Sequence, residues 1–599
     1  MKLYKEYLSA LENLRKGSKI TKAYFTSFNL SPEFFEKYIL PPLLNIDVPE
    51  NDYLYEPLNE ELENKVLKNN PELDIKVFYD ANMIKLTDKK LTLLKFTPIL
   101  MTNEQEKRKG LFHPKVIYIE NDKGKGILFV GSGNLTLSGW GRNIEAFQIV
   151  DIEKNSNLYY QIYNFFIDVE IQARLRTNRI LKPVSYEEEY NFIYSFEDNS
   201  NNSIFLESMN ANNSSKLYVW SPYFSESTKD NIDSIIKQNF PQTENVHIIP
   251  DLVGPDKKIR LKKKPESEKI KFYATKEQNS ENMNHSKVWI TDSKLGIGSY
   301  NFTHEALFGV NFEAAIVRDV KSVELDLEPI DFNKMNESEL KDEELKLNTD
   351  FNVIFELIAN YEKQSFEINQ LAGQEINDFS ILLPSGKECL KEELDDLSMI
   401  ELERIFRALI RNKLFKVKYE NKIVYEGIIF EKSTKGYREP IKVETINDLF
   451  ISFLDKKEPF SSKKLKNRNI NFDENNNDRY DNQTDTSYLN YFNLFKGFEN
   501  LKNKLTEIKS EIDLKHYCFT SGNSVSSIML IIEEYKEDEK HHNLFTYLFI
   551  KEFNLLVKEI NKIINKNKFS INKIQEIDNI KIKFSKDGKD EMFLKEFYG

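Results

Sequence analysis

Apolar and polar positions follow the same alternation in two separate stretches of the chain. Each stretch opens with an apolar run, KAYFTSF at 22–28 or KLYVWSPYF at 216–224, followed by a helical segment. Further strand-like runs come next, at 74–80, 91–96, 115–120, 127–134 and 143–150, and again at 245–251, 269–275, 287–292, 294–301 and 311–317. Apolar β-type runs that alternate with helical segments are typical of α/β units. The pattern therefore predicts an α/β fold with two similar lobes.

The rest of the chain differs from the two lobes. Residues 320–350 are acidic and helix-prone, 417–430 predict a β-hairpin, and the segments after 491 have helical periodicity. We expect a mixed, mainly helical C-terminal region. The predicted domains are a first lobe at 1–155, a helical connector at 156–200, a second lobe at 201–325, an acidic helical linker at 326–380 and a C-terminal accessory domain at 381–599 with a flexible stretch near 455–490.

Composition narrows the protein class. The 599 residues exceed what one hydrophobic core supports, so several domains are expected. No apolar run is long enough for a transmembrane helix, and the N-terminus lacks a signal-peptide pattern. We therefore expect a cytoplasmic protein without membrane contact. Cys389 and Cys518 are the only cysteines, which excludes a disulfide framework and a cysteine-based zinc site. The net charge of −12 argues against indiscriminate coating of nucleic acid but allows a local basic site.

The two lobes also share polar residues in one order. The order is His, Lys, Gly-Ser, Asn, Thr, Asn, Glu, Ala, and the chain contains only 7 histidines. We therefore infer an internal duplication that carries chemistry. The candidate catalytic residues are His113, Lys115, Asn134 and Glu145 in the first copy, and His285, Lys287, Asn301 and Glu313 in the second. Ser132 and Ser299 are candidate substrate-binding residues.

This set of side chains suits a tetrahedral anion. In each copy His and Lys are two positions apart on a strand, so they share one face, and the Gly-Ser turn ends the neighbouring strand. Two facing sets would surround one phosphate and allow displacement without a metal or cofactor. One neutral histidine attacks phosphorus and the other donates a proton. Lysines and asparagines stabilise charge on the oxygens, and each Glu is a candidate partner for an imidazole Nδ1–H.

These motifs resemble the phospholipase D superfamily, whose signature is HxK(x)4D followed by GSxN. His285, Lys287 and Asp292 fit it fully, whereas the first copy has Glu120 at the Asp position. The resemblance covers about residues 18–320 and implies two phospholipase D-like α/β/α lobes related by pseudo-twofold symmetry. It also implies that the acidic residue at position 120 or 292 is structural. By analogy with two-motif members, His113 is expected to be the nucleophile and His285 the acid.

The segment GSGNLTLSGWGRNIEAF further resembles tyrosyl-DNA phosphodiesterases and the phospholipase D-like nucleases of bacterial restriction and defence systems. The favoured hypothesis is a metal-independent DNA endonuclease in antiphage defence, with the C-terminal region available to a partner protein. A DNA-end repair phosphodiesterase, a phospholipase D or phosphatidyl transferase, and a non-catalytic nucleic-acid-binding subunit remain as alternatives.

A basic stretch before the second motif bears on the substrate. Lys262, Lys263 and Lys264 lie in DKKIRLKKKPESEKIK, and EKRKG occupies the corresponding place before His113. A charge run is as often a solvated loop as a binding site. Basic segments before both motifs would flank one cleft, which favours contact with a nucleic-acid backbone.

Overall fold

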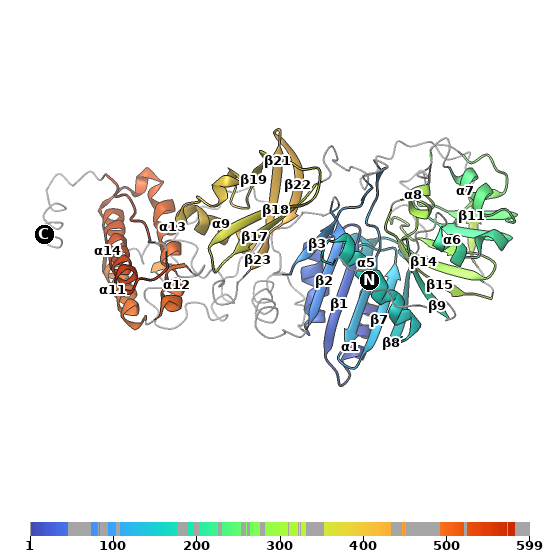
Figure 1. The fold of residues 1–599 in the computed structure, drawn as a ribbon, viewed down its shortest axis with the longest axis horizontal. Coiled ribbons are helices and arrows are strands. Elements are labelled where there is room, and N and C mark those ends of the chain that lie inside the picture. Colours follow the sequence, from blue (N-terminus) through green and yellow to red (C-terminus); the bar gives the residue numbers. More distant parts are fainter. Residues whose placement is uncertain are drawn as a thin grey trace, which may run out of the picture. The chain divides into compact units, whose positions relative to one another are not determined.

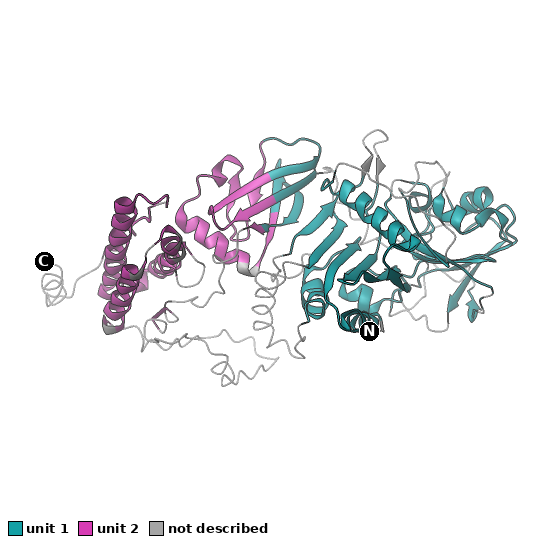
Figure 2. Cartoon of the chain, turned by 60° about the horizontal axis from the view of Figure 1, so that its bottom comes forward, with its two compact units in different colours: residues 1–356, 369–377, 416–430 teal, residues 357–368, 378–415, 431–599 magenta. Residues whose placement is uncertain are grey.

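The computed structural model describes residues 2–45, 73–176, 189–330, 353–432 and 491–581, with short gaps inside the second, third and fifth ranges, together with 446, 449 and 450. The chain divides into two compact units (Figure 2). The first contains 1–356, 369–377 and 416–430, and the second contains 357–368, 378–415 and 431–599. Both predicted lobes lie in the first unit.

The first lobe is built on a 6-stranded sheet with the order β3-β2-β1-β6-β7-β8 (Figure 1). Its strands are β1 Ile20–Ser27, β2 Asp74–Asp80, β3 Phe96–Ile99, β6 Val116–Asn121, β7 Lys125–Gly131 and β8 Phe147–Glu153. The strand pairs β1/β2 and β2/β3 are parallel, and β1/β6, β6/β7 and β7/β8 are antiparallel. A small ribbon, β4 Thr102–Asn103 with β5 Arg108–Lys109, precedes the first motif.

The second lobe repeats this topology in an 8-stranded sheet with the order β16-β12-β11-β10-β13-β14-β15-β9. Its strands are β9 Tyr190–Tyr194, β10 Lys216–Trp220, β11 Asn245–Ile249, β12 Ile270–Thr275, β13 Val288–Ile290, β14 Lys294–Gly298, β15 Ala314–Asp319 and β16 Leu327–Pro329. From β12 to β15 the order and the strand directions match those from β3 to β8. The α/β fold with two similar lobes is therefore confirmed, and β9 and β16 are additions at the two edges of the second sheet.

Helices cover both faces of the first sheet. Alternate strand residues such as Phe25 and Phe129 pack with α1 Lys2–Arg15, whereas Leu128 and Val130 pack with α5 Asn157–Gln172. The core around α5 also contains Phe192 and Ile316 of the second sheet and Phe312 just before β15, so α5 helps to join the lobes. The other helices among the described residues of this unit are short: α2 Pro32–Phe34, the π-helices Phe35–Ile39 and Ser138–Arg142, α3 Leu40–Leu43, α6 Ile204–Ser208, the 3-10 helix Ala211–Asn213, α7 Ile232–Asn239 and α8 His304–Leu307.

Two differences from the predicted elements concern the connecting segments. The connector at 156–200 contains helix α5 as predicted but also strand β9. In the predicted acidic helical linker, residues 331–352 lie outside the described part, and β17 Val353–Asn360 and β18 Ser365–Gly373 are strands. Helix was the wrong prediction for residues 353–373. The apolar run VIFELIA fits a strand buried on both faces, and the alternation in SFEINQLAG fits a strand buried on one face.

The C-terminal part combines small sheets with a helical bundle. The sheets have the orders β18-β17-β23 and β20-β19-β21-β22, with β19 Ser380–Leu382, β20 Glu388–Leu390, β21 Leu414–Tyr419, β22 Lys422–Ile428 and β23 Phe430–Lys432, and α9 is Met399–Arg411. One apolar cluster joins α11 Tyr491–Glu507, α12 Glu511–Phe519, α13 Val525–Lys536 and α14 Leu544–Asn567. The mixed, mainly helical C-terminal region is confirmed, and the stretch predicted as flexible, 455–490, lies outside the described residues.

Candidate active site

The two motifs occupy equivalent places in the two sheets. His113 and Lys115 lie immediately before β6, and the neighbouring strand β7 ends at Gly131; His285 and Lys287 precede β13, and β14 ends at Gly298. A side chain at either glycine would collide with backbone, since a Cβ would lie 2.4 Å from the Ala146 oxygen at Gly131 and 2.2 Å from the Ala314 oxygen at Gly298. Glycine therefore lets the segment that carries each glutamate pass close to the Gly-Ser turn.

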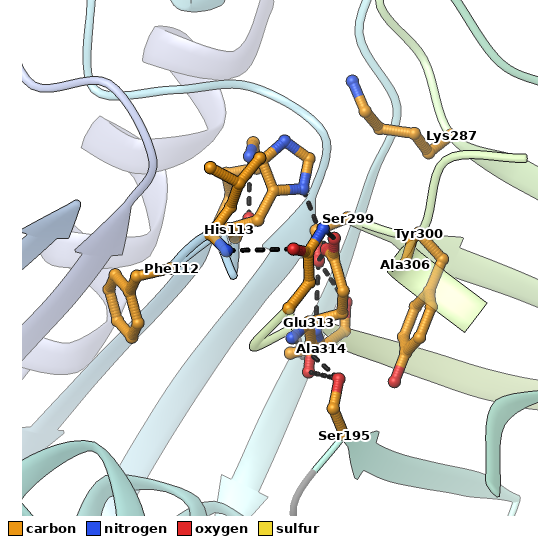
Figure 3. Close-up of polar contacts among 12 residues, drawn as sticks. Phe112, His113, Ser195, Lys287, Ser299, Tyr300, Ala306, Glu313 and Ala314 are labelled. Carbon is orange, nitrogen blue, oxygen red and sulfur yellow. Dashed lines mark hydrogen bonds and ion pairs between the residues drawn. The ribbon is translucent and has the colours of Figure 1, made fainter. Parts of the chain in front are cut away.

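The copies exchange contacts across the boundary between the lobes. The backbone N–H of His113 donates to the Phe312 oxygen (2.9 Å), and that of His285 donates to the Ile144 oxygen (2.9 Å). The side chains repeat this exchange. His113 Nδ1 lies 2.8 Å from Glu313 Oε2, and His285 Nδ1 lies 3.0 and 3.1 Å from the two oxygens of Glu145 (Figure 3 shows the first pair).

Each glutamate thus contacts the histidine of the other copy, so neither motif is complete within its own lobe. The motifs predict a glutamate at Nδ1 of each histidine, but they do not predict this exchange. Reciprocal contacts of this kind are what twofold symmetry produces at an interface. The pseudo-twofold relation itself stays a prediction.

Both glutamates are held by the same kinds of donor. Ser132 Oγ donates to Glu145 Oε2 (2.5 Å), and Ser299 Oγ donates to Glu313 Oε2. An asparagine two residues before each glutamate donates to Oε1, from Asn143 at 3.1 Å and from Asn311 at 3.3 Å. The serine hydroxyls are therefore directed at the carboxylates, and their predicted contact with substrate stays a prediction.

Two buried lysines accompany the histidines. Lys115 Nζ donates to the His113 oxygen (2.7 Å), and Lys287 Nζ donates to the His285 oxygen (2.8 Å). Lys287 Nζ also lies 2.7 Å from His285 Nε2. Both side chains are almost completely buried, where an ammonium acts more strongly on a nearby anion than it does in water. The predicted lysines are therefore placed next to the atoms that would carry the chemistry.

The two motif asparagines differ in their surroundings. Asn134 Oδ1 accepts the backbone N–H of Asn29 (3.2 Å). The corresponding Asn301 Oδ1 is buried and has no hydrogen-bond partner among the described residues. Both asparagines follow the Gly-Ser turn of their copy, and their predicted role at the phosphate stays a prediction.

Sequence reasoning missed a pair of serines that support this turn. Ser27 Oγ accepts the N–H of Leu135 (2.9 Å), and Ser221 Oγ accepts the N–H of Phe302 (2.9 Å). Each bonded residue directly follows a motif asparagine. The available signal was the repeated spacing Lys-x-Tyr-x-x-Ser in the two opening runs, at 22–27 and 216–221.

A pair of buried aspartates was missed as well. Asp80 Oδ2 accepts the N–H of Phe112 (2.8 Å), and Asp251 Oδ1 accepts the N–H of Asn284 (2.7 Å). Phe112 and Asn284 are the residues before the two histidines. The runs DIKVFYD and NVHIIPD both end in this aspartate, which was the signal in the sequence.

The two carboxyl groups differ in acidity. Burial raises the pKa of Glu313 to about 8, although Lys115, the bonds from Ser299 and Asn311, and Lys287 oppose the rise. Burial also acts on Glu145, but His285, Lys287 and Ser132 outweigh it and lower the pKa of that carboxyl. Pairs of titratable groups whose environments separate their pKa values are a feature of acid–base sites.

The acidic motif residues with an expected structural role and the basic stretch have other surroundings. Glu120 bonds to Lys22 (3.0 Å) and to the Tyr118 hydroxyl (2.6 Å), and Asp292 accepts the N–H of Ser215 (2.5 Å), contacts that fit the structural role implied by the resemblance. Lys262 and Lys263 lie outside the described residues, and Lys264 is exposed.

The described ranges contain neither a candidate metal-binding cluster nor a helix fit to span a membrane. No group of three or more His, Cys, Asp or Glu side chains there is arranged to hold a metal ion. Within the same ranges, no helix combines the length and the apolar character needed to cross a membrane.

Comparisons with known proteins complete the description of the site. No curated protein gives a significant match. Similar solved structures include phosphatidylserine synthase from Haemophilus influenzae Rd KW20 (12% identity, 56% of this chain and 87% of that chain, TM-score 0.36) and yeast tyrosyl-DNA phosphodiesterase (13% identity, 51% and 83%, TM-score 0.33). Polyphosphate kinase from Porphyromonas gingivalis is similar at 12% identity over 56% of this chain and 48% of that chain, with a TM-score of 0.32.

A protein-family model matches the second lobe. Residues 207–329 match the model described as "Cardiolipin synthase, PLD-like domain". This match includes the whole second motif, from His285 to Glu313, and the first lobe repeats its strand order and its polar residues. Residues 207–329 are therefore similar to a phospholipase D-like domain, and the resemblance to the phospholipase D superfamily is confirmed.

Proposed function

We propose that this protein is a phosphodiesterase that cleaves nucleic acid, with DNA as the favoured substrate, through a phosphohistidine intermediate. The observation that carries the proposal is the exchange of His–Glu pairs between the copies, with a buried lysine beside each histidine. One phosphate between the copies would face two imidazoles and two ammonium groups.

The proposed reaction has two steps. Nε2 of one histidine forms a bond to phosphorus while the bond from phosphorus to the leaving oxygen breaks, and the second histidine gives its proton to that oxygen. The second histidine then takes a proton from water, the water oxygen bonds to phosphorus, and the N–P bond breaks. Lys115 and Lys287 stabilise the charge on the non-bridging oxygens, helped by Asn134 and Asn301.

The choice of nucleic acid depends on charge near the site. Basic residues precede both motifs, in EKRKG and in the stretch that contains Lys262, Lys263 and Lys264. Such residues bind a phosphate backbone in a salt-dependent manner. A role in bacterial restriction or antiphage defence, with a partner protein bound at the C-terminal region, is part of the same proposal.

Phosphatidyl transfer is the second candidate function. It is favoured by the family match of residues 207–329, whose description names cardiolipin synthase. The same His–Lys chemistry would act on a lipid phosphodiester, so the substrate distinguishes the two candidates.

The test compares substrates and variants in the presence of EDTA. Plasmid DNA, a 3′-phosphotyrosyl oligonucleotide and phosphatidylglycerol vesicles are each incubated with the wild type, His113→Ala and His247→Ala. His247 is a matched control because it lies in β11 and stacks on Tyr218 (4.4 Å). Plasmid cleavage by the wild type and His247→Ala, but not by His113→Ala, is the expected result. Turnover of the vesicles alone would support the second candidate.

A gel-shift titration addresses the basic stretch. A variant with Lys262, Lys263 and Lys264 replaced by Gln is expected to bind DNA more weakly and with a smaller dependence on salt. An unchanged shift would remove these lysines from the proposed binding surface.

A further inference from the structure

A cavity apart from the paired histidines lies between helix α5 and the first sheet. It has a volume of about 110 Å³, and most of its lining comes from β1, β2, β6 and α5. Cavities of about 150 Å³ hold a single six-membered ring. Lys22 of the lining is near the start of β1, whereas Ser27, which supports the turn after Asn134, is at its end, roughly 16 Å away along the strand. The cavity is therefore at the opposite end of the sheet from the candidate active site.

Aromatic side chains form much of the cavity wall. Tyr24 and Tyr118 are cross-strand neighbours in β1 and β6, and α5 contributes Tyr159, Tyr163 and Phe166. The Phe166 ring packs edge-on against Tyr24, with 5.2 Å between the ring centroids. Tyr163 is 40% exposed, so the cavity opens to solvent beside this residue. A wall of rings with one open side suits a planar ligand.

One buried carboxylate belongs to the same wall. The side chain of Glu120 is 7% exposed; its Oε1 accepts from Lys22 (3.0 Å), and its Oε2 accepts from the Tyr118 hydroxyl (2.6 Å). Each carboxylate oxygen can accept two hydrogen bonds, so Glu120 has capacity for a further donor. An N–H group of a ligand inside the cavity is such a donor.

Three cations line the cavity nearer to solvent. The side chains of Lys22, Lys76 and Arg176 are 31–38% exposed. Glu170, which is 12% exposed, bonds to Lys76 (2.8 Å) and to Arg176 (3.0 Å). Together with Glu120 the lining carries three positive and two negative charges, a net charge of +1, and its positive groups are the more accessible ones. This distribution suits a ligand with an anionic group at the open side and uncharged N–H donors inside.

The duplication provides an internal comparison for the cavity. Both copies keep a lysine and a tyrosine at equivalent places in their opening strand. The strand partners of that tyrosine differ: they are Lys76 and Tyr118 for Tyr24, but His247 and Ile290 for Tyr218. The first copy therefore has a cation and a phenol hydroxyl where the second has an imidazole and an apolar side chain.

The acidic motif position differs between the copies as well. Asp292 accepts the backbone N–H of Ser215 (2.5 Å). Glu120 is one methylene group longer, and its carboxylate bonds to the Lys22 and Tyr118 side chains of the cavity wall. The departure of the first copy from the motif thus contributes directly to the lining of the cavity.

From this lining we propose a second ligand site in the first lobe, for a nucleoside monophosphate whose single-ring base carries an amino group, as cytosine does. The base lies among the tyrosine rings, its exocyclic amine donates to Glu120, and its phosphate contacts the three cations at the open side. Acceptance of the cytosine amine by a carboxylate is an established way of recognising that base. No bond is made or broken at this site, so the inference does not depend on the proposed function.

The experiment is isothermal titration calorimetry of the full chain with CMP and with UMP. The two ligands have the same charge and nearly the same size, and UMP lacks the amine that donates to Glu120. CMP is therefore expected to bind about 10-fold more tightly than UMP. Glu120→Gln, whose amide also donates, should remove this preference. Cytidine and inorganic phosphate should each bind more weakly than CMP.

Matched variants locate the binding. Lys22→Gln should weaken CMP binding by about 10-fold, whereas Lys216→Gln, at the equivalent place in the second copy, should leave it unchanged. His113→Ala should also leave it unchanged, because the active site is at the other end of the sheet. Tyr163→Ala keeps the test valid if Glu120→Gln fails to fold, since the exposed Tyr163 side chain can be removed without opening the core, and it too should weaken CMP binding.

Three outcomes would overturn the inference. They are the absence of saturable CMP binding, equal affinities of the wild type for CMP and UMP, and an affinity that falls with His113→Ala but not with Lys22→Gln. The last outcome would place the nucleotide in the active site instead of the cavity.

Discussion

Replacing each glutamate by glutamine should change stability with opposite dependence on pH. The pKa of Glu313 is raised from 4.5 to about 8, a difference that corresponds to about 5 kcal/mol for ionising this one buried carboxyl group. His113 Nδ1 can accept part of that proton, so the figure is an upper value. Because the folded-state pKa is raised, the contribution is fully present below pH 4.5 and is lost as the pH rises through about 8.

Glu313→Gln has no carboxyl group to ionise and so lacks this loss. Its melting temperature relative to the wild type should therefore increase as the pH goes from about 4.5 to above 8. Glu145 has a lowered pKa, so the wild type gains stability above pH 4.5 and loses it as the pH falls through the folded-state value. Glu145→Gln should accordingly be less stable than the wild type near neutral pH, with a deficit that shrinks in acid.

Tryptophan fluorescence is a suitable probe for this comparison. The 3 tryptophans, Trp140, Trp220 and Trp289, all belong to the first compact unit, so the signal reports the unfolding of the lobes. Thermal melts of the wild type and both variants would be recorded at about pH 3, 5, 6.5 and 8.5, so that the series includes the acid range in which the Glu145 contribution is lost. If both variants followed the same trend with pH, the inequality of the two His–Glu pairs would be refuted.

Two further predictions concern residues that the sequence did not assign. Asp80→Ala and Asp251→Ala should each lower turnover by about 10²-fold with little change in DNA affinity, because each removes the acceptor that holds the segment before a histidine. The Asn variants keep an acceptor oxygen and should recover activity. A change in DNA affinity alone would contradict the positioning role. In the second unit, Lys413 and Glu431 form a buried ion pair (2.6 Å). Lys413→Met should therefore lower the free energy of unfolding by about 3–5 kcal/mol in a denaturant melt followed by circular dichroism, and the double variant with Glu431→Leu should recover most of that loss. Equal melts for the single and double variants would argue against an energetic link.

Much of the fold could be predicted because local patterns determine it. The apolar runs of both lobes become strands in the same order, although β6 and β7 of the first copy are longer than β13 and β14 of the second. Strand β9 was missed because it occurs after a strong helical pattern, and its place at the edge of the second sheet depends on contacts distant in sequence. Residues 353–373 were misassigned because acidic residues before them favoured helix.

The site was predictable as a set of residues but not as a set of contacts. His, Lys, Asn and Glu could be identified because they repeat in order. Which glutamate contacts which histidine depends on how the lobes pack, and spacing along one copy says nothing about it. The aspartates at 80 and 251 lie in repeated runs, yet nothing in the sequence shows that their carboxylates accept backbone N–H groups of Phe112 and Asn284.

An inequality of the halves is what the proposed reaction requires. In that reaction the two histidines hold different protonation states at the same moment, because one attacks as a base and the other donates as an acid. Two identical halves would have equal proton affinities until a substrate bound. In a single chain each copy can be altered alone, and strand β9 with Ser195, which accepts the backbone N–H of Glu313, is a difference of this kind. If the proposed reaction holds, strand β9 bears on the chemistry as well as on the fold.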